Sequence, residues 1–362
     1  MQLVDWRLAA ATGTRLVPPG PKISLEAARA TVESLRRTAD RADRHVADVT
    51  GLDVATDSAT TVVVDRPDWI RANVESFQVM ADPIIETLLA RKPASIPGAV
   101  ATSIGSRAAG VEVGALLSYL ATRVLGQFEL LGPPRSAGNE RAPGRLTLVA
   151  PNIVAAERSL AVDPADFRLW VCLHEVTHRT QFAAAPWLHG HVQELLQEFL
   201  LASDLDTTAL LGRLRQAVSG LAGAARGNRE LSLVELIQTP EQRAILDRLT
   251  GLMSLLEGHA DVVMDIVGPE VVPSVGEIRK RFDQRRRDAN PLQRFVRRLL
   301  GVEMKMKQYA EGARFVRAVI AEVGMSGLNT VWRGPQQLPS GVEIRDPSRW
   351  LTRIGAPPAV SA

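Results

Sequence analysis

Cysteine and tyrosine are nearly absent from this chain, which contains one Cys and two Tyr among 362 residues. A lone Cys172 cannot form an internal disulfide, so we expect the protein to reside in a reducing compartment. We interpret Cys172 as a small buried residue, because no thiolate-stabilising partner can be assigned to it. Aromatic residues make up only 4% of the chain, which gives little support to stacking on nucleic-acid bases.

Long uncharged apolar runs are also missing, so the sequence predicts no membrane span. The first seven residues carry an early acid, Asp5, and lack a continuous apolar core, so we expect no signal peptide. Forty-three basic and forty acidic residues give a net charge of +3, a balance that does not favour nucleic acid as a partner. We interpret the nine Arg and Lys of residues 279–298 as a solvated helical face. A cytoplasmic protein with neither a nucleic acid nor a membrane as partner is therefore expected.

Only six histidines are present, and two of them flank a glutamate in the segment His174-Glu175-Val176-Thr177-His178. Residues i and i+4 of an α-helix share one face, with Cβ atoms about 5–6 Å apart, so both imidazoles can bind one metal ion. This HExxH spacing is typical of zinc sites in which the intervening Glu acts as a general base. His174 and His178 are therefore predicted to bind Zn²⁺, and Glu175 is predicted to take a proton from zinc-bound water.

The residues before the motif predict that it lies on a helix. Asp163 is a suitable N-cap, Pro164 suits the first helical position, and Asp166 complements the helix dipole in the first turn. No Gly or Pro follows until Pro186. We therefore expect the helix to continue to about Ala184 and to end before that proline.

A catalytic zinc site needs a third protein ligand and one open position. The extended pattern HExxHxxGxxH is excluded, because Gln181 and Ala184 occupy the positions of its Gly and its third His. A glutamate on a second helix is the other common solution, and Glu257 is our preferred candidate. Asp261 shares its helix face and is predicted to accept the second ring N–H of His174 or His178.

Other residues remain candidates for the same site. Glu194 and Glu198 follow the motif at a spacing that a short helical return can bridge. His259 can itself bind a metal ion. His189 and His191 lie close to the end of the motif helix, where they can cap it or line a cleft.

Six segments that together span nearly the whole chain carry a resemblance to a known family. They are residues 64–73 and 119–127, the HExxH motif, and residues 257–265, 307–312 and 338–350. Together they resemble the actinobacterial zincin-like family of zinc-dependent metallopeptidases, some members of which are associated with deazaflavin-coenzyme biosynthesis. The resemblance implies a zinc-binding, mainly helical, zincin-like domain, but it does not define a substrate.

Hydrophobic patterning agrees with a mainly helical chain that contains a small sheet, an α+β arrangement with the motif on a central helix. We expect one zincin-like domain over residues 1–362, or two packed lobes at 1–150 and 151–362. Strands are expected at 61–64 and 145–150, the latter forming an edge along which an extended peptide can lie. Further helices are expected at 24–51, at 68–89 with an interruption at Pro83, at 103–131, at 189–218, and from about 239 to 267.

The motif and the resemblance lead to one functional hypothesis and one alternative. The hypothesis is a zinc-dependent hydrolase, a peptidase with a peptide or protein substrate, in which Glu175 is the general base. Tyr309 is a candidate hydrogen-bond donor to an oxyanion, although a buried Tyr with a structural hydrogen bond is the more common outcome. The alternative is a catalytically inactive protein in which zinc stabilises a scaffold or an interaction domain. The sequence assigns no oligomeric state.

Overall fold

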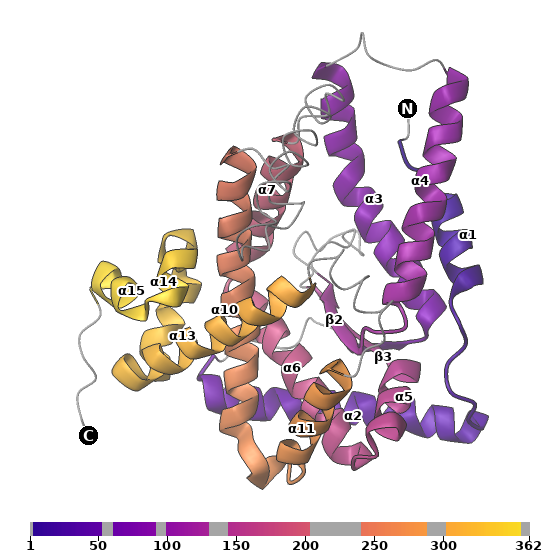
Figure 1. Cartoon of the computed structure of the whole chain (residues 1–362). Helices are drawn as coiled ribbons and strands as arrows, with labels where there is room; N and C mark the ends of the chain where they lie inside the picture. Colours follow the sequence, from indigo (N-terminus) through magenta and orange to yellow (C-terminus); the bar gives the residue numbers. More distant parts are fainter. Residues whose placement is uncertain are drawn as a thin grey trace, which may run out of the picture.

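The computed structural model describes residues 3–52, 61–91, 99–129, 144–202, 240–287 and 302–355. Within these ranges the chain is mainly helical and contains one three-stranded sheet (Figure 1). This is the fold class that the hydrophobic patterning predicted. The helices are α1 (Trp6–Leu16), α2 (Leu25–Thr50), α3 (Arg66–Arg91), α4 (Ala99–Leu120), α5 (Ala150–Leu160), α6 (Pro164–Ala184), α7 (Trp187–Leu201), α10 (Pro240–Val271), α11 (Val275–Arg287), α13 (Val302–Leu328), the 3-10 helices η2 (Asn329–Arg333) and η3 (Pro335–Gln337), α14 (Gly341–Arg345) and α15 (Pro347–Ile354).

The sheet has the strand order β1-β3-β2, with β1 at Thr61–Val64, β2 at Gly126–Glu129 and β3 at Arg145–Val149. Strand β3 pairs in parallel with β1 and antiparallel with β2. The predicted strands at 61–64 and 145–150 are thereby confirmed. The second is the central strand, however, so the prediction that it forms an edge was wrong, and β2 is the edge strand on the side of α6.

Strand β2 also corrects the helix predicted over residues 103–131. Helix α4 ends at Leu120, and the hydroxyl of Thr122 donates to the carbonyl of Tyr119 in the turn that follows. The chain then pairs with β3 from Gly126 onward. Apolar patterning alone did not reveal this change, because a short strand that is half-buried against a helix has no distinct period.

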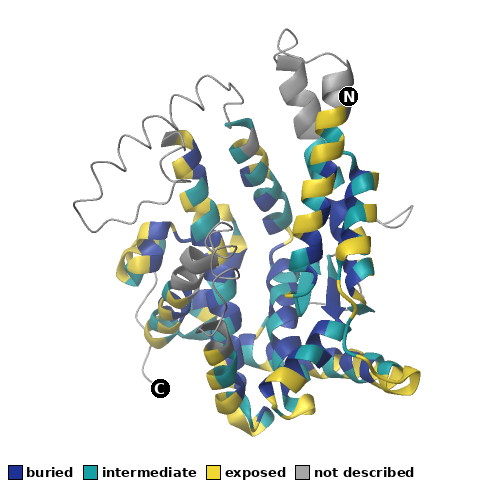
Figure 2. Cartoon of the chain, turned by 45° about the vertical axis from the view of Figure 1, so that its right-hand side comes forward, coloured by how far each residue is buried: buried dark blue, intermediate teal, exposed yellow. Residues whose placement is uncertain are grey.

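The motif helix α6 has the predicted bounds, and Asp163 caps it by accepting hydrogen bonds from the backbone N–H groups of Ala165 and Asp166. It runs through the middle of the molecule (Figure 1), and most of its residues are buried. Figure 2 shows that buried residues gather in the interior. Its first half packs against α2 in a core that includes Leu35, Phe167 and Leu173, all completely buried. Such burial fixes the rotation of α6, and therefore the direction in which the motif side chains point.

The second half of α6 packs with α7, α10 and α13 in another apolar core. Helices α10 and α13 cross very closely, because two glycines meet there. A Cβ atom at Gly312 would lie 1.8 Å from the carbonyl oxygen of Ser254, and one at Gly258 would lie 2.2 Å from the carbonyl carbon of Gly312. This crossing sets the position of α10 beside α6, and Glu257 precedes Gly258 in the chain.

A third apolar core lies between α1, α3 and α4. Here α1 and α4 pack closely at a glycine, since a Cβ at Gly114 would lie 2.5 Å from the carbonyl oxygen of Ala9. Helix α3 runs without a break through Pro83, where an interruption was expected. The predicted helix at 189–218 appears as α7 up to Leu201, and residues 203–239 lie outside the described ranges.

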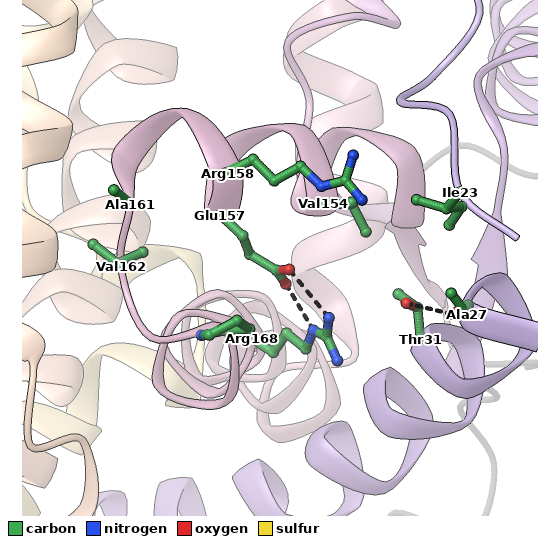
Figure 3. A pocket seen from close by; sticks show the side chains of 10 residues that line it. Ile23, Ala27, Thr31, Val154, Glu157, Arg158, Ala161, Val162 and Arg168 are labelled. Atoms are coloured by element: carbon green, nitrogen blue, oxygen red, sulfur yellow. Dashed lines mark hydrogen bonds and ion pairs between the residues drawn. The ribbon is translucent and has the colours of Figure 1, made fainter.

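A surface pocket of about 420 Å³ lies where α5 and the N-terminal ends of α2 and α6 meet (Figure 3). Glu157 and Arg168 face each other in its wall, with Nε of Arg168 2.7 Å from Oε1 of Glu157. The nearby hydroxyl of Thr31 donates to the carbonyl of Ala27. Glu157 and Arg168 therefore pair with each other, and Thr31 bonds within its own helix. Among the described helices, none is long and apolar enough to cross a membrane.

Candidate metal centre

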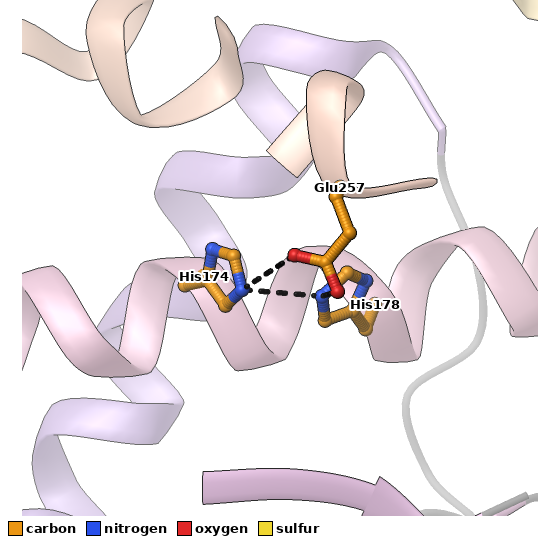
Figure 4. Close-up of side chains that lie close together, drawn as sticks. All are labelled: His174, His178 and Glu257. Carbon is orange, nitrogen blue, oxygen red and sulfur yellow. Dashed lines mark hydrogen bonds and ion pairs between the residues drawn. The ribbon is translucent and has the colours of Figure 1, made fainter. Parts of the chain in front are cut away.

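His174, His178 and Glu257 come together from two helices, α6 and α10 (Figure 4). The two Nε2 atoms are 3.3 Å apart, and the imidazole rings are nearly perpendicular, at 87°. Glu257 places Oε2 3.5 Å from Nε2 of His174 and Oε1 3.9 Å from Nε2 of His178. The preferred third residue thus lies beside both motif imidazoles, although it is distant from them in the chain.

These distances fit a tetrahedral zinc ion. Two ligand atoms bound to zinc at about 2.0–2.1 Å lie about 3.4 Å apart in that geometry. The His–His and His174–Glu257 separations are within a few tenths of an ångström of this value, and the candidate ligand atoms of all three residues lie within 4.8 Å of one another. Two nitrogens and one carboxylate oxygen are also the donor set of many catalytic zinc sites.

Glu175 lies beside this cluster, on the side of β2. Its side chain is buried, and a Cβ atom at Gly126 would lie only 2.8 Å from its carboxyl carbon. Burial raises the pKa of Glu175 to about 7, the charge of Glu257 adds to the rise, and His174 opposes it. A carboxyl group with a pKa near neutrality can both accept and return a proton at physiological pH.

Burial and the charge of Glu257 act in opposite directions on the two imidazoles of the cluster. Burial acts to lower the pKa of His174, but the hydrogen bond and negative charge of Glu257 outweigh it and raise the pKa to about 9. Burial lowers the pKa of His178. The carboxylate therefore attracts positive charge to the point where the two rings meet, which is also what a cation at this point requires.

Gln181 makes the hydrogen bond to the second ring nitrogen of His178 for which Asp261 was a candidate. Its Oε1 is 3.0 Å from Nδ1 of His178, while its Nε2 donates to the carbonyl of Leu256 at 2.9 Å. Sequence reasoning used this residue only to exclude the longer motif. No sequence signal indicated a hydrogen-bonding role, because an isolated Gln on a buried helix has no characteristic partner.

Asp261 points to Arg279, with carboxylate and guanidinium atoms 3.9 Å apart. Its charge contributes to the raised pKa of His174, but among the described residues it makes no hydrogen bond to either motif imidazole. The expectation that it accepts a ring N–H is therefore wrong in this conformation. Asp261 shares a helix face with Glu257, but its carboxylate turns toward Arg279 on α11 instead.

His259 is completely buried and lies behind Gln181, with Nδ1 3.0 Å from Nε2 of the glutamine. Gln181 thus lies between His259 and the metal cluster, although the sequence left His259 as a candidate metal ligand. Glu198 pairs with Arg248 at 2.6 Å, and the ring of His191 packs on Trp187. The backbone of Tyr309 belongs to α13, but its side chain lies outside the described part of the structure, so its role stays a prediction.

Among the described residues, the remaining earlier candidates form no second cluster that could hold a metal ion. Glu194 and His189 both belong to α7, and Cys172 is buried in the motif helix with its sulfur 4.0 Å from the carbonyl of Leu35. Burial raises the pKa of the Cys172 thiol well above its ordinary value, which keeps the thiol protonated. This agrees with the interpretation of Cys172 as a structural residue.

Two matches to known proteins cover nearly the whole chain. A family model described as zincin-like metallopeptidase matches residues 4–351. A crystal structure from Chloroflexus aurantiacus, described as a "putative hydrolase with a novel fold", has a TM-score of 0.66 and 32% sequence identity; the match covers 97% of this chain and 99% of that one. No curated protein matches. The expected actinobacterial origin and link to deazaflavin-coenzyme biosynthesis stay predictions, since neither match concerns them.

The family match covers nearly all of the chain, including the motif helix and the helix that supplies Glu257. On this basis, the chain belongs to the zincin-like metallopeptidase family.

Proposed function

We propose that this protein is a zinc-dependent hydrolase that cleaves peptide bonds in a peptide or protein substrate. The observation that carries the proposal is the meeting of His174, His178 and Glu257 beside the buried carboxyl group of Glu175. The family implies a metal cofactor, and the donor set and its spacing fit zinc.

In this mechanism His174, His178 and Glu257 hold the metal ion from two rigid helices. The chemistry that zinc would supply there is the acidification of a bound water molecule and the polarisation of a substrate carbonyl. Glu175 would take the proton of the attacking water and later deliver it to the leaving amine, a role suited to a carboxyl group that is buried beside the cluster. The carboxyl group is held between α6 and β2, which limits the directions in which it can move.

Strand β2 supports a peptide as the substrate class. It is one of the two edge strands of the described sheet, and its first residue, Gly126, lies against the proposed catalytic carboxyl group. An extended peptide that paired with this edge would bring successive carbonyls past Glu175. We further propose a cytoplasmic location, in keeping with the single cysteine.

The test combines metal analysis with one substitution. The purified protein is loaded with zinc and incubated with a mixture of unfolded proteins, and the products are identified by mass spectrometry. Glu175→Gln should keep zinc and lose about 10²–10⁴-fold in cleavage rate. Glu270→Gln, at an exposed position on α10, is the matched control and should behave as wild type.

Each alternative outcome has a definite meaning. A wild-type protein that binds no zinc contradicts the metal site. Cleavage by Glu175→Gln at the wild-type rate contradicts the general-base role. Zinc that raises stability equally in both forms, with cleavage in neither, would favour the alternative of a zinc-stabilised scaffold.

A further inference from the structure

The amide of Gln181 links the two helices that supply the candidate ligands. It is completely buried, and its hydrogen bond to the backbone carbonyl of Leu256 spans 75 residues of sequence. Leu256 directly precedes Glu257 on α10, and Gln181 lies three residues after His178 on α6. One side chain therefore contacts both halves of the cluster.

The direction of this amide follows from its partners. A backbone carbonyl can only accept, so the amide nitrogen of Gln181 must face Leu256 and the amide oxygen must face His178. Since that oxygen can also only accept, Nδ1 of His178 must carry the proton. The other ring nitrogen, Nε2, then presents its lone pair toward His174 and Glu257, which is the form that binds a metal ion.

The second hydrogen of the same amide fixes a second imidazole. Nδ1 of His259 accepts it at 3.0 Å, so the proton of neutral His259 lies on Nε2. His259 is completely buried against Trp332, with ring centroids 5.5 Å apart. Its Nε2 is buried without a hydrogen-bond partner among the described residues. The apolar contact and the amide together hold the ring in a single orientation behind Gln181.

We propose that Gln181 is a positioning residue of the metal site, which selects the Nδ1–H tautomer of His178 and keeps α10 in register with α6. His259 supports the amide from behind. The inference rests on the proposed function, because the role given to Gln181 is to present His178 and Glu257 to one metal ion. Groups that orient ligating imidazoles contribute about 10–100-fold to metal affinity.

The first experiment measures the tautomer in the unaltered, metal-free protein by nitrogen-15 NMR of the histidine side chains, at a pH where His178 is neutral. The His178 signals are assigned with His178→Asn. Protonation of His178 at Nδ1 is expected, whereas protonation at Nε2 overturns the proposal. This measurement needs neither zinc nor catalysis, so it distinguishes failure of the proposal from failure of the proposed function.

The second experiment measures zinc affinity. Gln181→Met fills a similar volume but makes none of the three hydrogen bonds, and it should weaken zinc binding about 10–100-fold. Thr180→Val is the matched control: Thr180 is buried on the same helix and its hydroxyl bonds only within the helix, to Val176. Both variants should lose stability, but only Gln181→Met should lose affinity. Equal zinc affinity of Gln181→Met and wild type overturns the proposal.

A third variant covers the case in which Gln181→Met does not fold. His259→Leu leaves Gln181 in place and removes only the acceptor behind it, so the expected loss of zinc affinity is smaller but measurable. Unchanged affinity in His259→Leu, with the Nδ1–H tautomer of His178 present in wild type, would remove His259 from the proposal and leave Gln181.

Discussion

Gly126 lies directly against the carboxyl group of Glu175. A Cβ atom at this position would be 2.6 Å from Cγ and 2.8 Å from Cδ of the glutamate, closer than non-bonded carbon atoms can approach. The backbone of β2 therefore forms one wall of the space that holds the proposed general base. Glycine is needed here for the close approach of two elements, since no unusual backbone angle is involved.

Gly126→Ala should lower activity with little loss of stability. The atoms that a methyl group would meet all belong to the side chain of Glu175 and none to the backbone, so the side chain can shift within the directions that α6 and β2 leave open. A displacement of about 1 Å in a catalytic group can cost about 10²-fold in rate. Zinc affinity and the urea midpoint should stay near wild type while kcat falls.

Gly190→Ala is the control for this prediction, because nothing lies within 4 Å of a Cβ atom there. A Gly126→Ala protein that loses zinc in proportion to its activity would contradict a selective effect on Glu175.

The site residues on α6 could be predicted from sequence, because the spacing of one helical turn makes them neighbours wherever the helix lies. Glu257 could be chosen only by analogy with other zinc sites. Its real position depends on the crossing of α10 and α13 at Gly258 and Gly312, a contact that no local pattern encodes. Gln181 and the edge strand β2 were missed for the same reason, since both roles arise from tertiary contacts. The division into two lobes stays a prediction.

Glu257→Gln should reduce zinc affinity while leaving the fold intact. The amide keeps the size of the side chain but removes the negative charge that faces both imidazoles at 3.5 and 3.9 Å. Loss of that charge should also let the pKa of His174 fall, because the raised value depends on Glu257. Isothermal titration with zinc measures the first effect, and NMR titration of the metal-free protein measures the second.

Glu198→Gln is the control for Glu257→Gln, since Glu198 pairs with Arg248 on the surface rather than with the motif. If Glu198→Gln weakened zinc binding and Glu257→Gln did not, the assignment of the third ligand would have to be reversed.

Gly312→Ala should destabilise the protein and weaken zinc binding together. Its Cβ would lie 1.8 Å from the backbone oxygen of Ser254, so α10 and α13 must move apart. Overpacking of this kind typically costs about 1–3 kcal/mol. Because Glu257 lies on α10, the shift should carry it away from His174. Urea unfolding and zinc titration measure the two effects.

Gly276→Ala has open space around the new methyl group and should change neither quantity. A stable Gly312→Ala protein with full zinc affinity would show that the crossing of α10 and α13 does not position Glu257.

Glu343 should make stability fall in acid. It completes a capping box with Ser340 and accepts two hydrogen bonds from Arg353, at 2.7 and 3.2 Å. Burial alone would raise its pKa, but the bonds to Arg353 and Ser340 outweigh burial and hold the pKa below the ordinary value of 4.5. The unfolded chain therefore binds a proton more readily than the folded one. The stabilisation by Glu343 is complete at a pH above 4.5, the ordinary pKa of the group, and it is lost as the pH falls through the lowered pKa of the folded protein.

Replacing Glu343 with Gln should remove this part of the pH dependence, so that the free energies of unfolding of variant and wild type converge as the pH falls. Urea unfolding from about pH 7 to about pH 3 measures the convergence. Glu322→Gln, at an exposed position on α13, should run parallel to wild type over the same range. A constant difference between Glu343→Gln and wild type at every pH would mean that the side chain stabilises α14 by packing rather than by its charge, because only a charged contribution can be titrated away.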